Sequence, residues 1–146
     1  MIKLQNKMGA YKLLLIVDDD KDDCFFFRSA IRKNNPSYEC IEAENGADAL
    51  KQLRQTKLLP DFIFLDLNMP KMGGQECLKE LKKDETLKKI PVIIYSTSGH
   101  KVDITITKEF GADYFLTKLF DIYSLPEELM KAMEKAVENS NQSSAY

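Results

Sequence analysis

Short apolar runs alternate with amphipathic stretches along most of the chain. Runs of a few aliphatic residues are typical of strands that are buried on both faces of a sheet. Five such strands are predicted, at residues 13–17, 38–43, 61–67, 91–95 and 114–117. Helical spacing of apolar residues predicts five intervening helices, at about residues 22–34, 45 to near 60, 75–83, 100–110 and 124–138. Strands that alternate with helices indicate an α/β fold, with a parallel sheet covered on both faces.

Two of these helices carry a more specific expectation. In the helix over 22–34, the spacing places four apolar side chains on the buried side, namely Phe26, Phe27, Ala30 and Ile31. The helix over 100–110 is rich in β-branched residues, which lose side-chain freedom in a helix. We therefore expect it to be the least regular of the five.

The two ends of the chain are expected to lie outside the folded unit. Ser124 to Glu127 read as a capping box with proline in the first turn, which begins the last helix. Residues 1–11 are interpreted as a lead-in before the first strand, and residues 139–146 as a flexible polar tail. One domain, at residues 12–138, remains.

Composition narrows the class of protein. The chain has 146 residues, of which 44% are hydrophobic and 30% charged, as expected for one soluble domain. A net charge of -2 argues against nucleic-acid binding. The longest aliphatic run, at 13–17, is too short to span a membrane. The cysteines, Cys24, Cys40 and Cys77, lack metal-ligand spacing, which favours reduced thiols in a cytoplasmic protein.

Polar side chains follow four of the five predicted strands. Asp18, Asp19 and Asp20 come after the first strand, Asp66 and Asn68 lie at the end of the third, residues 96–98 carry hydroxyls after the fourth, and Lys118 ends the fifth. A single residue of this kind is commonly a cap or a solvated side chain, and Asp20, Asp22 and Asp23 fit the first turn of a helix. However, ligands of open α/β sheets bind at the carboxyl ends of the strands, where these side chains converge.

If these side chains converge, the carboxylates of Asp18, Asp19 and Asp66 would lie within several ångströms of one another. Carboxylates at that separation raise one another's pKa unless a cation neutralises them. An oxygen-rich site with open positions suits Mg²⁺. A lysine and a hydroxyl that face the same point would bind a phosphoryl group.

These residues resemble the receiver domain of bacterial two-component response regulators in its single-domain form. The matching segments are residues 17–19 (VDD), 65–70 (LDLNMP) with Met72 and Gly73, 91–96 (PVIIYS), and 111–113 (GAD) through Phe115 to Lys118. The resemblance covers about residues 12–138. It implies a doubly wound sheet of five parallel strands in the flavodoxin-like order 2-1-3-4-5.

The resemblance also implies a role for each matching residue. Asp66 would be the phosphoacceptor and form an aspartyl phosphate. Mg²⁺ or Mn²⁺ would be bound by Asp19, Asp66 and the backbone carbonyl of Asn68, with Asp18 acting through a water molecule. Phosphoryl binding and switching would fall to the remaining matching residues, namely Ser96, Thr97, Lys118 and Phe115.

A signalling role follows from the same resemblance. The phosphoryl group would come from a sensor histidine kinase or a histidine phosphotransfer protein, and the domain would catalyse only its own phosphorylation and dephosphorylation. Phosphorylation would draw Ser96 toward the phosphoryl group, let Phe115 turn inward, and reshape the surface formed by residues 100–110, 114–117 and 124–138. Since few residues follow the predicted domain, the output is expected to be binding of a protein target or onward transfer, with no nucleic-acid or membrane partner.

Three positions differ from the family's pattern or stand apart from it. Leu119 follows Lys118 where the family has proline, so a trans bond is expected. Thr97 is larger than the residue common at that position. Both differences favour an alternative in which the fold is a constitutive docking module without phosphorylation. His100, the one histidine, is interpreted as a surface residue at a helix start.

A second alternative is a haloacid-dehalogenase-like phosphatase, which also uses a strand-end aspartate and Mg²⁺. The segment Asp18-x-Asp20 fits the opening motif of that family. However, Lys21 and Asp22 stand where Thr or Val is expected, and no acidic strand-end pair follows Lys118.

Overall fold

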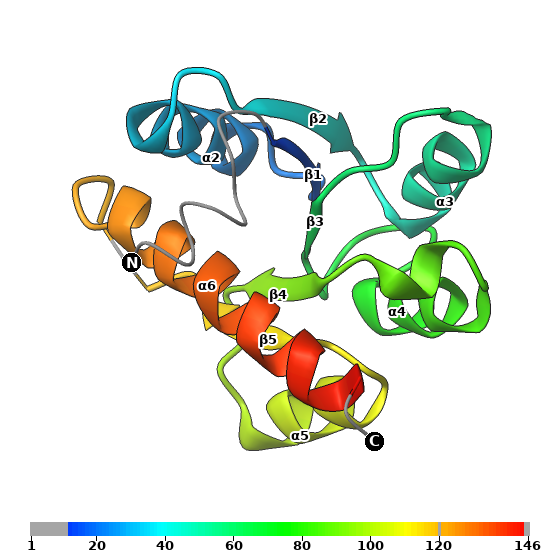
Figure 1. Cartoon of the computed structure of the whole chain (residues 1–146). Helices are drawn as coiled ribbons and strands as arrows, with labels where there is room; N and C mark the ends of the chain where they lie inside the picture. Colours follow the sequence, from blue (N-terminus) through cyan, green and yellow to red (C-terminus); the bar gives the residue numbers. More distant parts are fainter. Residues whose placement is uncertain (1–11, 120, 145–146) are drawn as a thin grey trace.

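The sheet is parallel throughout and carries its strands in the order β2-β1-β3-β4-β5 (Figure 1). A computed structural model of the chain describes residues 12–119 and 121–144. The α/β class, the five parallel strands and their predicted order are confirmed. The predicted lead-in at residues 1–11 lies outside the described residues.

Every predicted strand and helix is present, with ends that differ by a few residues. The strands are β1 (Leu13–Val17), β2 (Glu39–Ala43), β3 (Phe62–Leu65), β4 (Val92–Ser96) and β5 (Tyr114–Thr117). The helices are α2 (Lys21–Asn34), α3 (Gly46–Gln55), α4 (Gly74–Lys83), α5 (Lys101–Glu109) and α6 (Leu125–Ser144), and a short 3-10 helix that was not predicted, η1 (Leu87–Lys89), precedes β4.

The sheet separates two hydrophobic clusters, one on each face. In Figure 1, α2 and α6 lie to the left of the sheet and α3 and α4 to its right. The first cluster includes Phe27 and Phe64, whose rings meet edge to face with centroids 4.8 Å apart. The second includes Leu50 of α3 and Leu78 of α4. Both faces of the central strands are therefore covered, which explains why those strands are continuously apolar.

The buried side of α2 differs from the prediction at one position. Cys24, Phe27, Ala30 and Ile31 are buried, whereas Phe26 remains 40% exposed. The buried residues follow the helical repeat from Cys24 onward, and Phe26 lies beside that stripe. The buried stripe of α2 therefore includes Cys24 and leaves Phe26 partly exposed.

The last helix is longer than predicted and begins differently. Residues 139–144, expected to be a flexible tail, continue α6 as far as Ser144. The side-chain amide of Asn139 donates a hydrogen bond of 2.7 Å to the carbonyl oxygen of Asp113, which ties this part of the helix to the start of β5. A capping box would have the backbone N–H of Ser124 donate to the side chain of Glu127. In the structure this N–H donates to the Asp121 carboxylate instead.

Helix α5, expected to be the least regular, is a continuous α-helix of nine residues. Of its side chains only Thr107 is buried, and the Thr107 hydroxyl donates to the carbonyl oxygen of Asp103. Val102 and Ile104 are exposed. Helix α5 therefore buries fewer side chains against the rest of the domain than the other four helices do.

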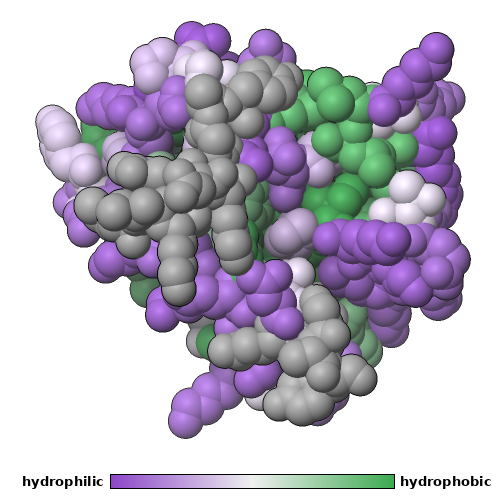
Figure 2. Space-filling model, in the orientation of Figure 1, coloured by the Kyte–Doolittle hydropathy of each residue, from purple (hydrophilic) through white to green (hydrophobic). Residues whose placement is uncertain are grey.

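Hydrophilic residues cover most of the face seen in Figure 2, around a smaller hydrophobic area.

Among the residues that the structure describes, none of the helices combines the length and the apolar character needed to span a bilayer.

The three cysteines are free, as predicted, and we expect them to resist alkylation. Burial raises the thiol pKa to about 11 for Cys24 and Cys40 and to about 12 for Cys77. At pH 8 only about one thiol in a thousand is then the reactive thiolate for Cys24 and Cys40, and about one in ten thousand for Cys77. Iodoacetamide labelling followed by mass spectrometry should be far slower for the folded protein than for the protein in urea, with the half-buried Cys40 reacting first. Labelling of Cys77 at the rate of an exposed thiol would contradict this packing.

Candidate functional site

Three carboxylates meet at the carboxyl edge of the sheet, as predicted. Asp18 follows β1, Asp66 follows β3, and the last residues of these neighbouring strands, Val17 and Leu65, are paired in register. One carboxylate oxygen from each of Asp18, Asp19 and Asp66 lies within 4.8 Å of the others. Asp18 and Asp66 are buried, while Asp19 is exposed. The cluster is therefore accessible from solvent on the Asp19 side.

The loop after β3 fixes the position of Asp66. The Asp66 carboxylate accepts a hydrogen bond of 2.8 Å from the backbone N–H of Leu67. The carbonyl oxygen of Leu67 in turn accepts from the N–H of Gly74, the first residue of α4. Asn68, the predicted carbonyl ligand, is exposed in this loop, and Lys71 adopts a positive φ of 66°. The chain thus turns sharply between Asp66 and α4.

Lys118 reaches into the acidic cluster from the end of β5. Its ammonium nitrogen lies 2.6 Å from Asp18 Oδ2 and 2.8 Å from Asp23 Oδ2, and both carboxylates accept hydrogen bonds. Asp66 Oδ2 is farther away, at 3.8 Å. The ammonium also lies 5.1 Å from the centroid of the Tyr95 ring, a favourable cation–π position. Lys118 is thus close to Asp66 but hydrogen-bonded to its neighbours.

Burial and hydrogen bonding shift the pKa of each partner, Asp18 and Lys118, in opposite directions. Burial raises the pKa of Asp18 to about 6, and the hydrogen bond from Lys118 opposes that rise. Burial alone would lower the pKa of Lys118, but hydrogen bonds to Asp18 and Asp23 outweigh it and raise the pKa well above its ordinary value. Both partners are therefore charged at pH 7.

The predicted hydroxyl residues lie at the end of β4, beside Lys118. Ser96 is fully buried, and its carbonyl oxygen accepts a hydrogen bond of 2.7 Å from the N–H of Lys118. Thr97 is exposed and lines a hollow together with Lys118 and Asp23. No peptide bond between described residues is cis, so the bond between Lys118 and Leu119 is trans, as expected.

Phe115, the predicted aromatic switch, is half-buried in β5. It pairs in register with Ile94 of β4 and packs against the hydrophobic cluster that includes α3 and α4. It therefore lies on the opposite face of the sheet from Tyr95, whose ring belongs to the other cluster and contacts Lys118.

Asp23 is the site residue that the sequence did not reveal. It was interpreted as one of three acids in the first turn of a helix, and that interpretation is correct for Asp20, whose carboxylate accepts from the N–H groups of Asp22 and Asp23 and caps α2. The Asp23 side chain, by contrast, turns toward Lys118. Its place in the first turn, close in sequence to Asp18, is the one signal that could have indicated this contact.

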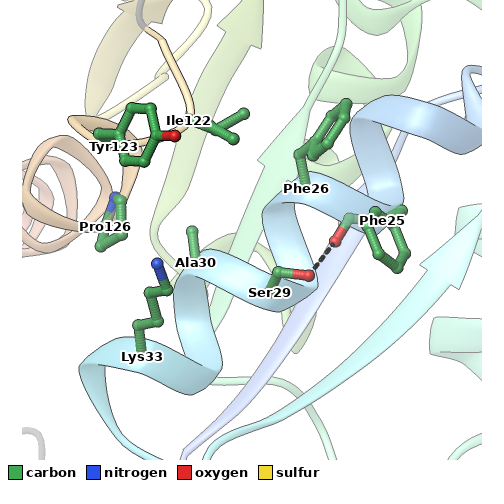
Figure 3. Close-up of a pocket in the computed structure, with 8 residues that line it drawn as sticks. All are labelled: Phe25, Phe26, Ser29, Ala30, Lys33, Ile122, Tyr123 and Pro126. Carbon is green, nitrogen blue, oxygen red and sulfur yellow. Dashed lines mark hydrogen bonds between the residues drawn. The ribbon is translucent and has the colours of Figure 1, made fainter.

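An apolar hollow between α2 and the segment before α6 adjoins the site (Figure 3). It is lined by Phe25, Phe26, Ser29, Ala30, Lys33, Ile122, Tyr123 and Pro126. Phe26 and Ile122 also line the hollow that contains Lys118 and Thr97. The two hollows therefore share the side chains of Phe26 and Ile122.

Comparison with known proteins decides the family. The family model of the response regulator receiver domain matches residues 14–133. The chain belongs to this family. The response regulator Rcp1 of Synechocystis is 33% identical over 112 residues, which cover 73% of this chain and 76% of Rcp1. Membership favours the receiver interpretation over the phosphatase alternative.

Two solved response regulators share the fold. The phosphorylated cyanobacterial phytochrome response regulator RcpA is 33% identical, with a TM-score of 0.77 over 86% of this chain and 92% of RcpA. The Mn²⁺-bound form of Rcp1 is 30% identical, with a TM-score of 0.74 over 82% of this chain and 90% of Rcp1. This receiver domain therefore has the architecture of proteins solved in phosphorylated and in metal-bound forms.

The acidic cluster of this receiver fits a divalent cation. It offers three hard oxygen ligands, of which Asp19 is open to solvent. Asp66 also raises the pKa of Asp18 by like-charge repulsion, and a bound cation would remove that repulsion.

Proposed function

We propose that this receiver is a cytoplasmic protein that accepts a phosphoryl group on Asp66 from a sensor histidine kinase or a histidine phosphotransfer protein. The observation that carries the proposal is the convergence of Asp66 with two further carboxylates and with Lys118, 3.8 Å away. The receiver would act by binding a protein target or by passing the phosphoryl group on. Its own phosphorylation and dephosphorylation would be the reactions that it catalyses.

Mg²⁺ or Mn²⁺ would be held by Asp19, Asp66 and the backbone carbonyl of Asn68, with Asp18 acting through a water molecule. The cation would neutralise negative charge on the incoming phosphoryl group and on the carboxylates. The Mn²⁺-bound form of Rcp1 supports a divalent cation in this family.

In the transfer step, one Asp66 carboxylate oxygen forms a bond to phosphorus while the donor's bond from phosphorus to nitrogen or oxygen breaks. The donor group leaves with the electron pair of that bond. Lys118 would then bind a phosphoryl oxygen, and the hydroxyl of Ser96 and the backbone N–H groups of Asn68 and Thr97 would hold the others. The proposal is supported by the 3.8 Å separation of Lys118 Nζ from Asp66 Oδ2, and by the position of Ser96 at the end of β4, the strand beside β3.

The output would follow from a change at Ser96. A phosphoryl group adds about -1.5 to -2 charges and would draw the Ser96 hydroxyl toward it. The space that Ser96 leaves would admit the Phe115 ring and reshape the surface of α5, β5 and α6. Val102, which is 65% exposed, and Ile104 of α5 give that surface apolar groups for a partner.

Incubation with Mg²⁺ and a small acyl phosphate, followed by intact mass spectrometry, tests the proposed function. We expect one phosphoryl group per chain when Mg²⁺ is present and almost none when it is chelated. Absence of any mass increase, together with absence of an NMR response to beryllofluoride and Mg²⁺, would favour the constitutive docking module.

Ser96→Ala should separate modification from switching. Because Ser96 contributes a hydroxyl and no carboxylate, the variant should bind Mg²⁺ nearly as the wild type does. We expect its α5, β5 and α6 amide resonances to shift much less on addition of beryllofluoride. The same resonance shifts in Ser96→Ala and wild type would contradict the switch role of Ser96.

A further inference from the structure

Lys118 divides its hydrogen bonds unequally among the carboxylates around it. An ammonium group has three N–H donors. Two of them are directed to Asp18 Oδ2 at 2.6 Å and to Asp23 Oδ2 at 2.8 Å. Asp66 Oδ2, at 3.8 Å, lies beyond hydrogen-bond distance. In this state the lysine is therefore held at Asp18 and Asp23 rather than at the proposed phosphoacceptor.

Asp23 lies in the capped first turn of α2, and its side chain meets Lys118 at the edge of the acidic site. The Asp20 carboxylate caps α2 and accepts from the N–H of Asp23 at 3.1 Å. The Asp23 side chain is one-third exposed, at 33%, whereas that of Lys118 is only 9% exposed. Asp23 thus reaches the buried ammonium from the solvent side, and both residues line the hollow that Thr97 borders.

We propose that Asp23 is a positioning residue that holds Lys118 away from Asp66 until a phosphoryl group competes for it. This inference rests on the proposed phosphorylation of Asp66. Asp18 would be engaged with the cation site in the loaded protein, whereas Asp23 lies outside that carboxylate cluster and would keep its hydrogen bond to Lys118. Asp23 is therefore the carboxylate against which the phosphoryl group has to compete.

The sign of the effect follows from this competition. Removing the Asp23 charge weakens the hydrogen bond that holds Lys118, so the ammonium can move toward the phosphoryl oxygens, and it reduces the negative potential that a phosphoryl group meets. Both changes favour the phosphorylated state over the free state. Weakening the hydrogen bond between Asp23 and Lys118 should therefore strengthen the binding of a phosphoryl mimic.

Asp23→Asn with Asp22→Asn as the matched control tests the inference. Asp22 lies in the same turn and carries the same charge, but it is exposed and its carboxylate is not among the partners of Lys118. With Mg²⁺ present, we expect beryllofluoride to bind Asp23→Asn about threefold more tightly than wild type, the size typical of a partly exposed ion pair, and to bind Asp22→Asn as it binds wild type. Equal affinities for the two variants would overturn the inference.

A second measurement reports on Lys118 without any phosphoryl group. In the free protein, NMR of the lysine side-chain ammonium groups should show a shifted and faster-exchanging Lys118 signal in Asp23→Asn, and an unchanged signal in Asp22→Asn. A helix-stabilising role alone would leave that signal unchanged, and such a result would contradict the inference. If the Lys118 signal responds but wild type does not bind beryllofluoride, the anchoring of Lys118 is supported and the proposed phosphorylation fails.

Discussion

Asp66→Asn is expected to abolish phosphorylation by a small acyl phosphate while leaving the fold intact. An amide oxygen is a far weaker nucleophile than a carboxylate, and the substitution also removes one of the three charges that would hold the cation. Intact mass spectrometry in the presence of Mg²⁺ measures the loss directly. Circular dichroism checks that the helices and strands remain.

The same variant should be slightly more stable than wild type without metal. Asp66 repels Asp18, and the amide removes that repulsion, whereas the ion pair lost with Lys118 is long, at 3.8 Å. We expect urea unfolding in a chelator to give a gain of about 1 kcal/mol or less. Asp22→Asn is the control and should keep full phosphorylation. A phosphorylated Asp66→Asn chain would place the acceptor elsewhere.

Gly74→Ala should have the largest effect on stability among the substitutions near the site. A Cβ at this first residue of α4 would overlap the carbonyl oxygen of Asp66 and lie 2.8 Å from the Cα of Leu67. Both atoms belong to the backbone, so the loop that carries the phosphoacceptor has to move. We expect a loss of about 3 kcal/mol in the free energy of unfolding, and slower phosphorylation, because overpacking displaces Asp66.

Gly99→Ala is the matched control for that prediction. A Cβ at Gly99 would lie 3.5 Å from the Thr117 methyl carbon, which is an ordinary van der Waals contact. Its free energy of unfolding should stay within about 0.5 kcal/mol of wild type. Equal stability of Gly74→Ala and Gly99→Ala in urea would show that α4 can withdraw from Asp66 without cost.

The fold was largely predictable because the sheet is buried on both faces. Continuous apolar strands stand out against amphipathic helices, and this contrast located all five strands. Two errors have different causes. The extension of α6 is accompanied by the hydrogen bond from Asn139 to Asp113, and this distant contact leaves no local pattern in the sequence. The exposure of Phe26 is local in origin, because the buried stripe of α2 runs through Cys24, Phe27 and Ile31 and Phe26 lies beside it.

The acidic cluster was predictable because strand ends in a parallel sheet meet at one edge. Asp18, Asp19 and Asp66 need only the order of neighbouring strands to come together. The bond between Asp23 and Lys118 joins residues 95 positions apart and depends on which way a helical side chain turns. Because an acid in the first turn of a helix has a sufficient local explanation, the sequence gives no reason to seek a second role for Asp23.

The most direct test of the central claim is to locate the phosphoryl group on the chain. Borohydride reduces an aspartyl phosphate to homoserine, which peptide mass spectrometry can place at a single residue. After treatment with Mg²⁺ and a small acyl phosphate, we predict homoserine at position 66 and unmodified Asp18 and Asp19. Homoserine at another aspartate, or phosphorylation found only on His100, would contradict the account.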